Sequence, residues 1–287
     1  MKIGRFVKNG KETFGFVKDG RVATREEITY TTGVPLPYSI KDFLFDGWFE
    51  EIMKKSPQLT FKEDLSKYTI LPPIANPPKI MCLAFNYMDH AEEQKTNPPD
   101  EPVIVMKPRT TLTGTNSEIC SPTFVEKLDY EVELALIIGK NSKNISESDT
   151  MNAIFGYMIF NDVSARGIQF QDKQFTRAKS FDTFAPCGPW ITTADEILDP
   201  QNLKMTTKIN GELRQNSSTS KMFLKIPEIV SKLSKVMTLE KGDIISTGTP
   251  QGVVLNNPNL EFLKDGDRIE MEIENLGKLE NTVKFFD

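Results

Sequence analysis

Short apolar runs bounded by turn-forming residues follow one another from Lys79 onward and limit the folds open to this chain. Runs of this length and spacing are typical of β-strands. They cover residues 80–83, 103–106, 132–138, 155–160, 203–209, 244–247, 269–273 and 279–285. In the same part of the chain, helical periodicity occurs at residues 87–95, 164–173 and 226–237. The sequence therefore predicts an α+β fold in which strands predominate.

Residues 1–70 are predicted to form a small N-terminal α/β domain. Its first alternating runs are separated by Asn9-Gly10 and Asp19-Gly20, pairs that are typical of hairpin turns. A helical stretch with one apolar side follows, formed by Phe43, Phe45, Trp48, Phe49 and Ile52. The proline-rich segment 71–78 is typical of a linker, because proline stiffens the chain and cannot donate to a sheet. We therefore place a second domain at residues 71–287.

Charge and residue counts exclude several classes of function. The 35 Lys+Arg and 40 Asp+Glu residues give a formal net charge of −5, without the basic surface that nucleic-acid binding requires. No apolar run reaches the roughly 18 residues of a membrane span, and the first residues lack the apolar core of a secretory signal. Cys82, Cys120 and Cys187 show no paired spacing, which favours free thiols in the reducing cytoplasm.

The single histidine, His90, restricts the kinds of metal site that the chain can form. A cluster of histidine ligands is impossible, and the cysteines lack the spacing of a thiolate site. Any bound metal must be held by oxygen atoms, which favours Mg²⁺, Mn²⁺ or Ca²⁺.

Glu131 and Glu133 are the first candidate ligands, since residues two apart on a strand share a face. Five consecutive apolar residues follow them at 134–138, as in a strand buried on both faces. Residues 268–274 instead alternate polar and apolar, as a strand with one solvent-facing side does. Two buried carboxylates repel unless a cation compensates them. A metal site and a solvated acidic edge both stay open at this point.

Three other positions could carry chemistry. Asp162 follows an apolar strand. It could be a third carboxylate ligand for the same cation, or it could be the N-cap of the next helix. His90 and Glu93 lie one helical turn apart. They could be a general base with the carboxylate that orients it, or they could form a contact on the surface. The backbone and hydroxyl groups of residues 247–253 could hold a carboxylate, or form an ordinary Gly-Pro turn.

Six motifs occur in an order that resembles the fumarylacetoacetate hydrolase family. They are Asn-Tyr-x-x-His-x-x-Glu at 86–93, Lys-Pro at 107–108, Asp-Tyr-Glu-x-Glu-Leu at 129–134, Asn-Asp-x-Ser-Ala-Arg at 161–166, Lys-Ser-Phe-Asp-Thr-Phe-x-Pro-x-Gly-Pro at 179–189 and Gly-Asp-Ile-Ile-Ser-Thr-Gly-Thr-Pro-x-Gly-Val at 242–253. Each motif alone is weak, but their order over residues 80–285 is specific. The resemblance implies a core of the family's mixed β-sandwich or roll type, preceded by a variable small domain.

The resemblance also implies roles for individual residues. The expected ligands of a divalent metal, Mg²⁺ or Mn²⁺ with Ca²⁺ as a further option, are Glu131, Glu133 and Asp162. The expected catalytic residues, a dyad on a helical lid and a lysine near the metal, are His90, Glu93 and Lys179. The expected substrate-binding residues are Arg166, Gln169 and Thr249. The chain departs from the family pattern at Ala84, because the family usually has glycine two residues before Asn86. The resemblance therefore does not determine the backbone conformation at the entrance to the lid.

The implied function is metal-dependent chemistry on a 2-oxo acid through a metal-bound enolate. Hydrolysis of an acylpyruvate-like substrate is favoured, because His90 oriented by Glu93 can deprotonate a water molecule. Oxaloacetate decarboxylation uses the same site without water. Isomerisation of 2-hydroxyhepta-2,4-diene-1,7-dioate is the alternative, and a non-catalytic metal- or carboxylate-binding protein is a further one. The resemblance also implies a homodimer.

Overall fold

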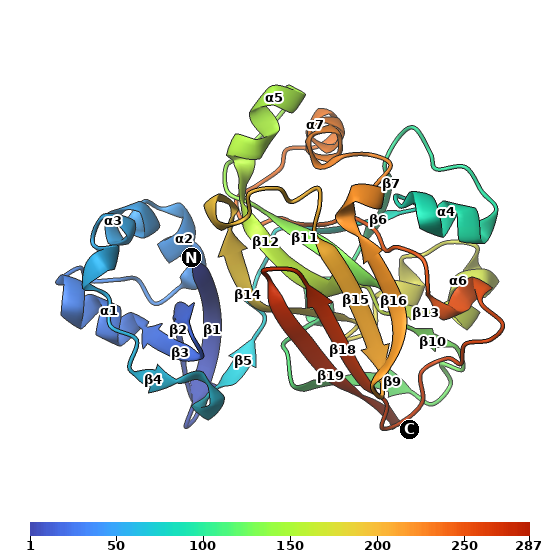
Figure 1. The fold of residues 1–287 in the computed structure, drawn as a ribbon, viewed down its shortest axis with the longest axis horizontal. Helices are drawn as coiled ribbons and strands as arrows, with labels where there is room; N and C mark the ends of the chain where they lie inside the picture. The colour runs from blue at the N-terminus through green and yellow to red at the C-terminus, as the bar shows by residue number, and fades with distance from the viewer.

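Short strands and a few helices build a small N-terminal part and a larger C-terminal part (Figure 1). The computed structural model describes residues 1–287, apart from the side chain of Asn256. The N-terminal elements are β1 (Lys2–Lys8), β2 (Lys11–Lys18), β3 (Arg21–Thr24), α1 (Arg25–Thr32), α2 (Ile40–Phe45), α3 (Trp48–Lys54), β4 (Glu63–Asp64) and β5 (Thr69–Leu71). The later helices are α4 (Met88–Gln94), α5 (Glu147–Thr150), α6 (Arg166–Asp172) and α7 (Ile226–Val236). The later strands are β6 (Ile80–Ala84), β7 (Val103–Met106), β8 (Leu112–Thr113), β9 (Ser117–Pro122), β10 (Leu128–Asp129), β11 (Val132–Ile138), β12 (Ile154–Asn161), β13 (Ser164–Ala165), β14 (Ala185–Thr193), β15 (Lys204–Ile209), β16 (Glu212–Ser218), β17 (Ile244–Ser246), β18 (Arg268–Ile273) and β19 (Gly277–Phe286).

Two mixed sheets form the framework. The first has twelve strands in the order β4-β3-β2-β1-β14-β12-β11-β17-β6-β7, with β5 beside β1 and β8 beside β14. The second has five strands in the order β16-β15-β18-β19-β9. Parallel pairs such as β17 with β6 and β19 with β9 occur among antiparallel ones. The strand-rich α+β fold predicted from the sequence is therefore confirmed.

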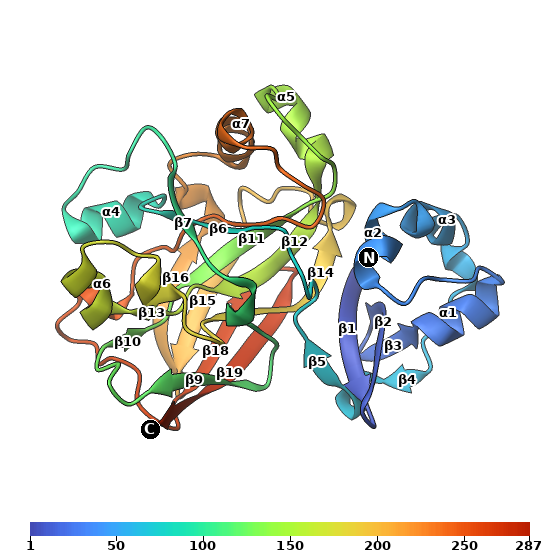
Figure 2. The same ribbon diagram turned by 180° about the vertical axis from the view of Figure 1, so that it is seen from behind.

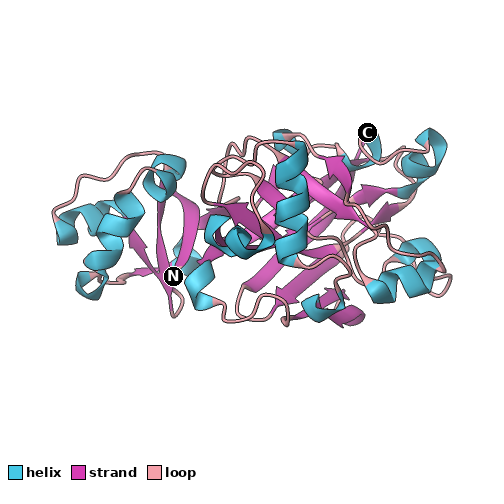
Figure 3. Cartoon of the chain, turned by 90° about the horizontal axis from the view of Figure 1, so that it is seen from above, coloured by secondary structure: helices cyan, strands magenta, loops and turns pink.

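Strand β11 is buried on both faces, as its unbroken apolar run predicts. Leu134, Leu136 and Ile138 pack into a core with the second sheet and with α7, which lies across the top of the sheets (Figure 3). Ala135 and Ile137 point to the opposite face, into a second core that includes the aromatic side chains of the N-terminal part. Each face of β11 thus has its own apolar partners, which fixes the register of the strand.

The aromatic stretch of the N-terminal part differs from the sequence prediction. Instead of one helix, α2 and α3 are separated at Gly47, whose φ of +88° is a left-handed conformation that glycine adopts readily. The turn lets Phe43 and Phe49 meet edge to face, with ring centroids 6.2 Å apart. Two short helices therefore cover the sheet face where one straight helix was expected.

The first sheet continues from the N-terminal part into the C-terminal part. Strand β1 pairs with β14, with Lys2 opposite Thr192 and Ile3 opposite Ile191. The expected domain boundary at residues 70 and 71 falls near the end of β5, and the division into two domains stays a prediction. Throughout the part of the chain that the structure describes, no helix is long and apolar enough to span a membrane.

Candidate active site

Three buried carboxylates meet where β11 and β12 lie side by side. Val132 is paired with Asn161, so the residues next to them, Glu131 and Asp162, are also neighbours, and the Asp162 N–H donates to the Glu131 carbonyl at 3.0 Å. Glu133 lies two residues farther along β11. One carboxylate oxygen from each of the three lies within 4.8 Å of the others. The three side-by-side acids therefore form a compact oxygen cluster.

Burial decides between the interpretations that the sequence left open. Glu131 is 6% exposed, and Glu133 and Asp162 are each 1% exposed, so the solvated acidic edge is wrong for this strand. Strand β18, by contrast, alternates as expected, with Ile269, Met271 and Ile273 buried. Asp162 does not cap α6 either, because that helix begins at Arg166 with Ala165 as its N-cap.

Each carboxylate has one oxygen fixed by the surrounding fold. Arg166 Nη2 donates to Glu131 Oε1 at 2.5 Å. Lys107 Nζ donates to Asp162 Oδ1 at 2.6 Å. The Gly248 backbone N–H donates to Glu133 Oε2 at 3.1 Å. A second oxygen on each carboxylate is thus left for a shared partner, and Lys179 Nζ donates to two of these, Glu131 Oε2 at 2.7 Å and Asp162 Oδ2 at 2.5 Å.

The charges of the cluster are unevenly compensated. Burial alone would raise the pKa of Glu131, but Lys179 and Arg166 lower it to about 2. Burial and the nearby Asp162 and Glu131 raise the pKa of Glu133 well above its usual range. Among the residues that the structure describes, Glu133 forms no salt bridge. A further positive charge beside Glu133 would therefore stabilise the cluster.

The donor set fits a hard divalent cation. Mg²⁺, Mn²⁺ and Ca²⁺ accept carboxylate oxygens as ligands. Each of the three acids offers one such oxygen, while its other oxygen is held by the fold. Lys107, Lys179 and Arg166 do bind two of the acids, as a purely internal ion-pair network would. The incompletely compensated Glu133 distinguishes the cluster from such a network, because a buried carboxylate of that kind is costly without a cation.

His90 lies on α4, which faces the cluster from the same side of the molecule as α6 (Figures 1 and 2). It is 5% exposed, so the surface contact considered from the sequence is wrong. The Gln94 side-chain amide contacts His90 Nε2. Nδ1 lies 3.5 Å from Glu93 Oε2, although the two atoms make no hydrogen bond. Glu93 in turn accepts from the Gly252 N–H at 3.3 Å, which ties α4 to the loop after β17.

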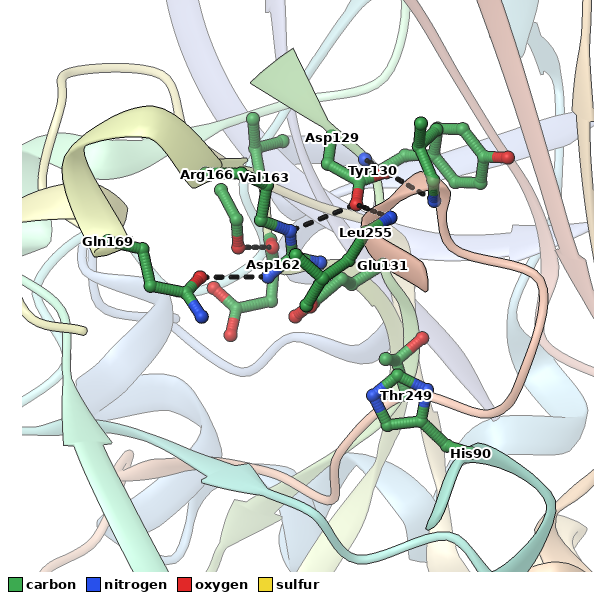
Figure 4. A network of polar contacts seen from close by, with 12 residues as sticks. His90, Asp129, Tyr130, Glu131, Asp162, Val163, Arg166, Gln169, Thr249 and Leu255 are labelled. Atoms are coloured by element: carbon green, nitrogen blue, oxygen red, sulfur yellow. Dashed lines mark hydrogen bonds and ion pairs between the residues drawn. The ribbon is translucent and has the colours of Figure 1, made fainter. Parts of the chain in front are cut away.

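The three expected substrate-binding residues are largely committed to the protein itself. Arg166 donates to Asp129 and to Glu131, and Gln169 Oε1 accepts from Arg166 at 3.0 Å (Figure 4). Thr249 Oγ1 donates to the Val132 carbonyl at 3.1 Å. Contacts of these side chains with a substrate stay predictions.

A small cavity of about 30 Å³ brings the expected residues together. Its walls include all of them except Glu93: they are His90, Glu131, Glu133, Asp162, Arg166, Gln169, Lys179 and Thr249. His90 and Thr249 lie on one side of the acids (Figure 4).

Three residues that support this site were not among the sequence candidates. Lys107 and Asp129 lie in two of the motifs, and each bonds a site residue from a buried position. Gln215 lies on β16 and gave no sequence signal. It is fully buried, accepts from the Val132 N–H at 3.1 Å and donates to Thr249 Oγ1 at 3.0 Å.

We expect Gln215→Leu to destabilise the fold by roughly 2–4 kcal/mol, because it leaves the buried Val132 N–H and the Pro250 carbonyl without their partner. Chemical denaturation followed by circular dichroism measures this loss. Gln171→Leu, at an exposed glutamine on α6 that does not line the cavity, is the control for general effects of losing an amide. A Gln215→Leu protein as stable as the parent chain would contradict the anchoring role.

Comparison with known proteins agrees with these observations. The model for the C-terminal domain of fumarylacetoacetate (FAA) hydrolase matches residues 79–284. A mitochondrial oxaloacetate tautomerase of Xenopus laevis is 41% identical over 252 residues, which are 86% of this chain and 79% of that protein. A maleylpyruvate hydrolase from Sphingobium sp. SYK-6, solved with manganese(II) and pyruvate, is 32% identical with a TM-score of 0.81 over 100% of both chains. A 2-hydroxyhepta-2,4-diene-1,7-dioate isomerase from Mycobacterium marinum is 33% identical with a TM-score of 0.77 over 99% of this chain and 98% of that one. The chain belongs to the fumarylacetoacetate hydrolase family.

Proposed function

We propose that this protein is a divalent-metal-dependent enzyme that hydrolyses a carbon–carbon bond in acylpyruvate-like 2-oxo acids. The observation that carries the proposal is the acid cluster of Glu131, Glu133 and Asp162, with His90 and Lys179 on the walls of the same cavity. The similarity to a maleylpyruvate hydrolase that was solved with manganese and pyruvate supports it. A protein that only binds metal has no use for a buried histidine on the wall of the cavity that contains the acids.

The residues of the chain divide the reaction between them. When bound, the ion supplies Lewis-acid chemistry toward the oxygens of a 2-oxo acid. His90 takes a proton from water at its unprotonated ring nitrogen, and the water oxygen adds to the distal carbonyl carbon. The bond between that carbon and the pyruvate carbon then breaks, and its electron pair passes to the pyruvate fragment, which takes up the proton. Lys179 adds positive charge where the negative charge develops, and the products are a carboxylic acid and pyruvate.

The first test measures pyruvate released from acetylpyruvate, with Mg²⁺ or Mn²⁺ and then with EDTA. We expect release only with metal, and a higher melting temperature with metal, since a ligand of the folded state raises it. Equal rates in chelator would contradict metal dependence, and a melting temperature that no divalent ion changes would contradict the metal site.

His90→Ala is expected to slow acylpyruvate hydrolysis by about 10²–10⁴-fold, because it removes the base that activates water. Steady-state pyruvate release measures the effect. Binding of metal should be kept, and the metal-induced rise in melting temperature is the control. Hydrolysis at the normal rate in this variant would contradict the role of His90.

Keto–enol conversion of oxaloacetate is a second candidate, favoured by the 41% identity to the Xenopus tautomerase. It needs a proton shuttle such as His90 but no attacking water. Decarboxylation of oxaloacetate at the same site also needs no water, and either activity in His90→Ala would leave the hydrolytic role of His90 intact. Absorbance of the oxaloacetate enol and carbon dioxide release distinguish these reactions from hydrolysis.

The homodimer and the cytoplasmic location expected from the sequence stay predictions, and the name of the Xenopus relative places that protein in mitochondria.

A further inference from the structure

The turn between β6 and α4 contains a backbone conformation that a bulky side chain rarely adopts. Phe85 has a φ of +60°, in the left-handed region, and apart from glycine it is the only apolar residue with a positive φ in the described part of the chain. It lies directly between Ala84, the last residue of β6, and Asn86. Such strain persists only where neighbouring contacts determine the conformation, and it often marks a functional position.

Asn86 provides these contacts. Its side chain is 3% exposed and donates to the carbonyls of Thr247 and Leu224 at 2.9 and 3.2 Å. It also accepts from the Leu224 N–H at 2.8 Å, while the Phe223 N–H donates to its carbonyl at 2.8 Å. The residue after Phe85 is thus held on both sides, which keeps the Phe85 ring on the wall of the cavity.

Phe85 meets a second aromatic side chain there. Its ring packs edge to face against Phe175, with centroids 5.9 Å apart and an interplanar angle of 73°. Both rings line the cavity that contains the acid cluster. The neighbouring lining residues are also apolar: Leu83, Ala84, Val105 and Leu255. The cavity therefore has an apolar wall in addition to its acidic one.

The positively charged side chains that line the cavity are already paired with carboxylates of the protein. Among the described lining residues, the permanently charged cations are Arg166 and Lys179, and both are bonded to carboxylates. A substrate carboxylate against the aromatic wall would lose its hydration without gaining an ion pair. Against the face of a ring it would also meet negative potential, whereas a planar apolar group packs well there.

We propose that Phe85 and Phe175 determine specificity by binding the acyl end of the substrate, and that they select an apolar, preferably aryl, acyl group over one that ends in a carboxylate. This inference rests on the proposed hydrolysis of acylpyruvates and names the class of acyl group. The acid cluster would receive the 2-oxo acid end, and the aromatic wall the other end. Both residues are specificity-determining rather than catalytic, since they offer no group for proton transfer.

The test compares kcat/KM for benzoylpyruvate, whose acyl end is a phenyl group, with that for maleylpyruvate, whose acyl end bears a carboxylate. Both release pyruvate, so one assay serves for both. We expect the parent protein to favour benzoylpyruvate by about tenfold or more. Phe175→Arg places a cation in the wall and should reduce that preference at least about tenfold, mainly through a lower KM for maleylpyruvate. Phe85→Gly keeps the left-handed backbone accessible and should raise the KM for benzoylpyruvate with little change in kcat.

Phe170→Ala is the matched control, because Phe170 is 59% exposed on α6 and does not line the cavity. Each variant must show the metal-induced rise in melting temperature of the parent protein. If Phe175→Arg does not fold, the Phe85→Gly result decides alone. Release of pyruvate from both substrates with equal kcat/KM, or variants that leave the ratio unchanged, would overturn this inference but not the proposed hydrolysis. Release from neither substrate would overturn both.

Discussion

Glu133→Gln is expected to lower metal-dependent pyruvate release by about 10³-fold or more, and at the same time to make the protein more stable in chelator. The loss of activity follows from removing one of three oxygen ligands for the ion that polarises the substrate. The gain in stability follows because burial and two neighbouring acids raise the pKa of the Glu133 carboxyl, so its charged form is costly at neutral pH. We expect a gain on the order of 1 kcal/mol or more. Thermal and denaturant unfolding in EDTA, with pyruvate release in Mg²⁺, measure the two effects.

Glu272→Gln on β18 is the matched control, because Glu272 is an exposed glutamate on the alternating strand. It should change neither activity nor metal binding. A Glu133→Gln protein that is less stable in chelator would show that Glu133 is compensated within the fold. One that keeps its metal-induced rise in melting temperature would remove Glu133 from the metal site.

Glu131→Gln should have the opposite effect on stability, with a loss of roughly 3–5 kcal/mol. Glu131 is bonded to Arg166 at 2.5 Å and to Lys179 at 2.7 Å, and its pKa is lowered to about 2. Without its charge, two buried cations lose a partner, which is much costlier than losing an exposed ion pair. Denaturant unfolding in EDTA measures the loss, and activity and the metal-induced rise in melting temperature should disappear together.

The two substitutions are chemically identical and two residues apart, so their comparison separates a ligand from a structural ion pair. Equal changes in stability would contradict the charge distribution described here. A stable Glu131→Gln protein would mean that Asp129 and Asp162 alone suffice for Arg166 and Lys179.

Much of the fold follows from local patterns in the sequence. The apolar run 132–138 matches β11 residue for residue, and 103–106 matches β7, because both are short runs with polar or turn-forming neighbours. The stretch 40–54 was less tractable, since an apolar side at helical spacing does not show that Gly47 turns the chain. Likewise, residues 164 and 165 pair with β10 rather than begin a helix, because a distant strand offers hydrogen bonds that no local pattern reveals.

The acids of the site could be chosen from the sequence because charge before an unbroken apolar run is unusual. The residues that bond to these acids or support them could not all be predicted from the sequence in the same way. Lys107 belongs to the Lys-Pro motif, but nothing in that motif shows that the lysine lies beside Asp162. Gln215 lies on a strand with an ordinary polar pattern. Arg166 was expected near the substrate, and the structure shows it bonded to Asp129 and Glu131. Partners of this kind depend on long-range pairing, which a linear pattern does not encode.

The pairing of β1 with β14 has a consequence for how the chain folds during translation. Residues 2 and 3 meet residues 191 and 192, so this end of β1 has no partner on that side until most of the polypeptide has left the ribosome. Residues 5–7 of the same edge pair with β5, which is made much earlier. The hairpins of β1, β2 and β3 involve near neighbours and can form early. The unpaired first residues of β1 would meanwhile be open to association with other nascent chains. Late pairing of residues 2 and 3 with β14, after the hairpins of β1, β2 and β3 have formed, is the folding order to expect from this topology.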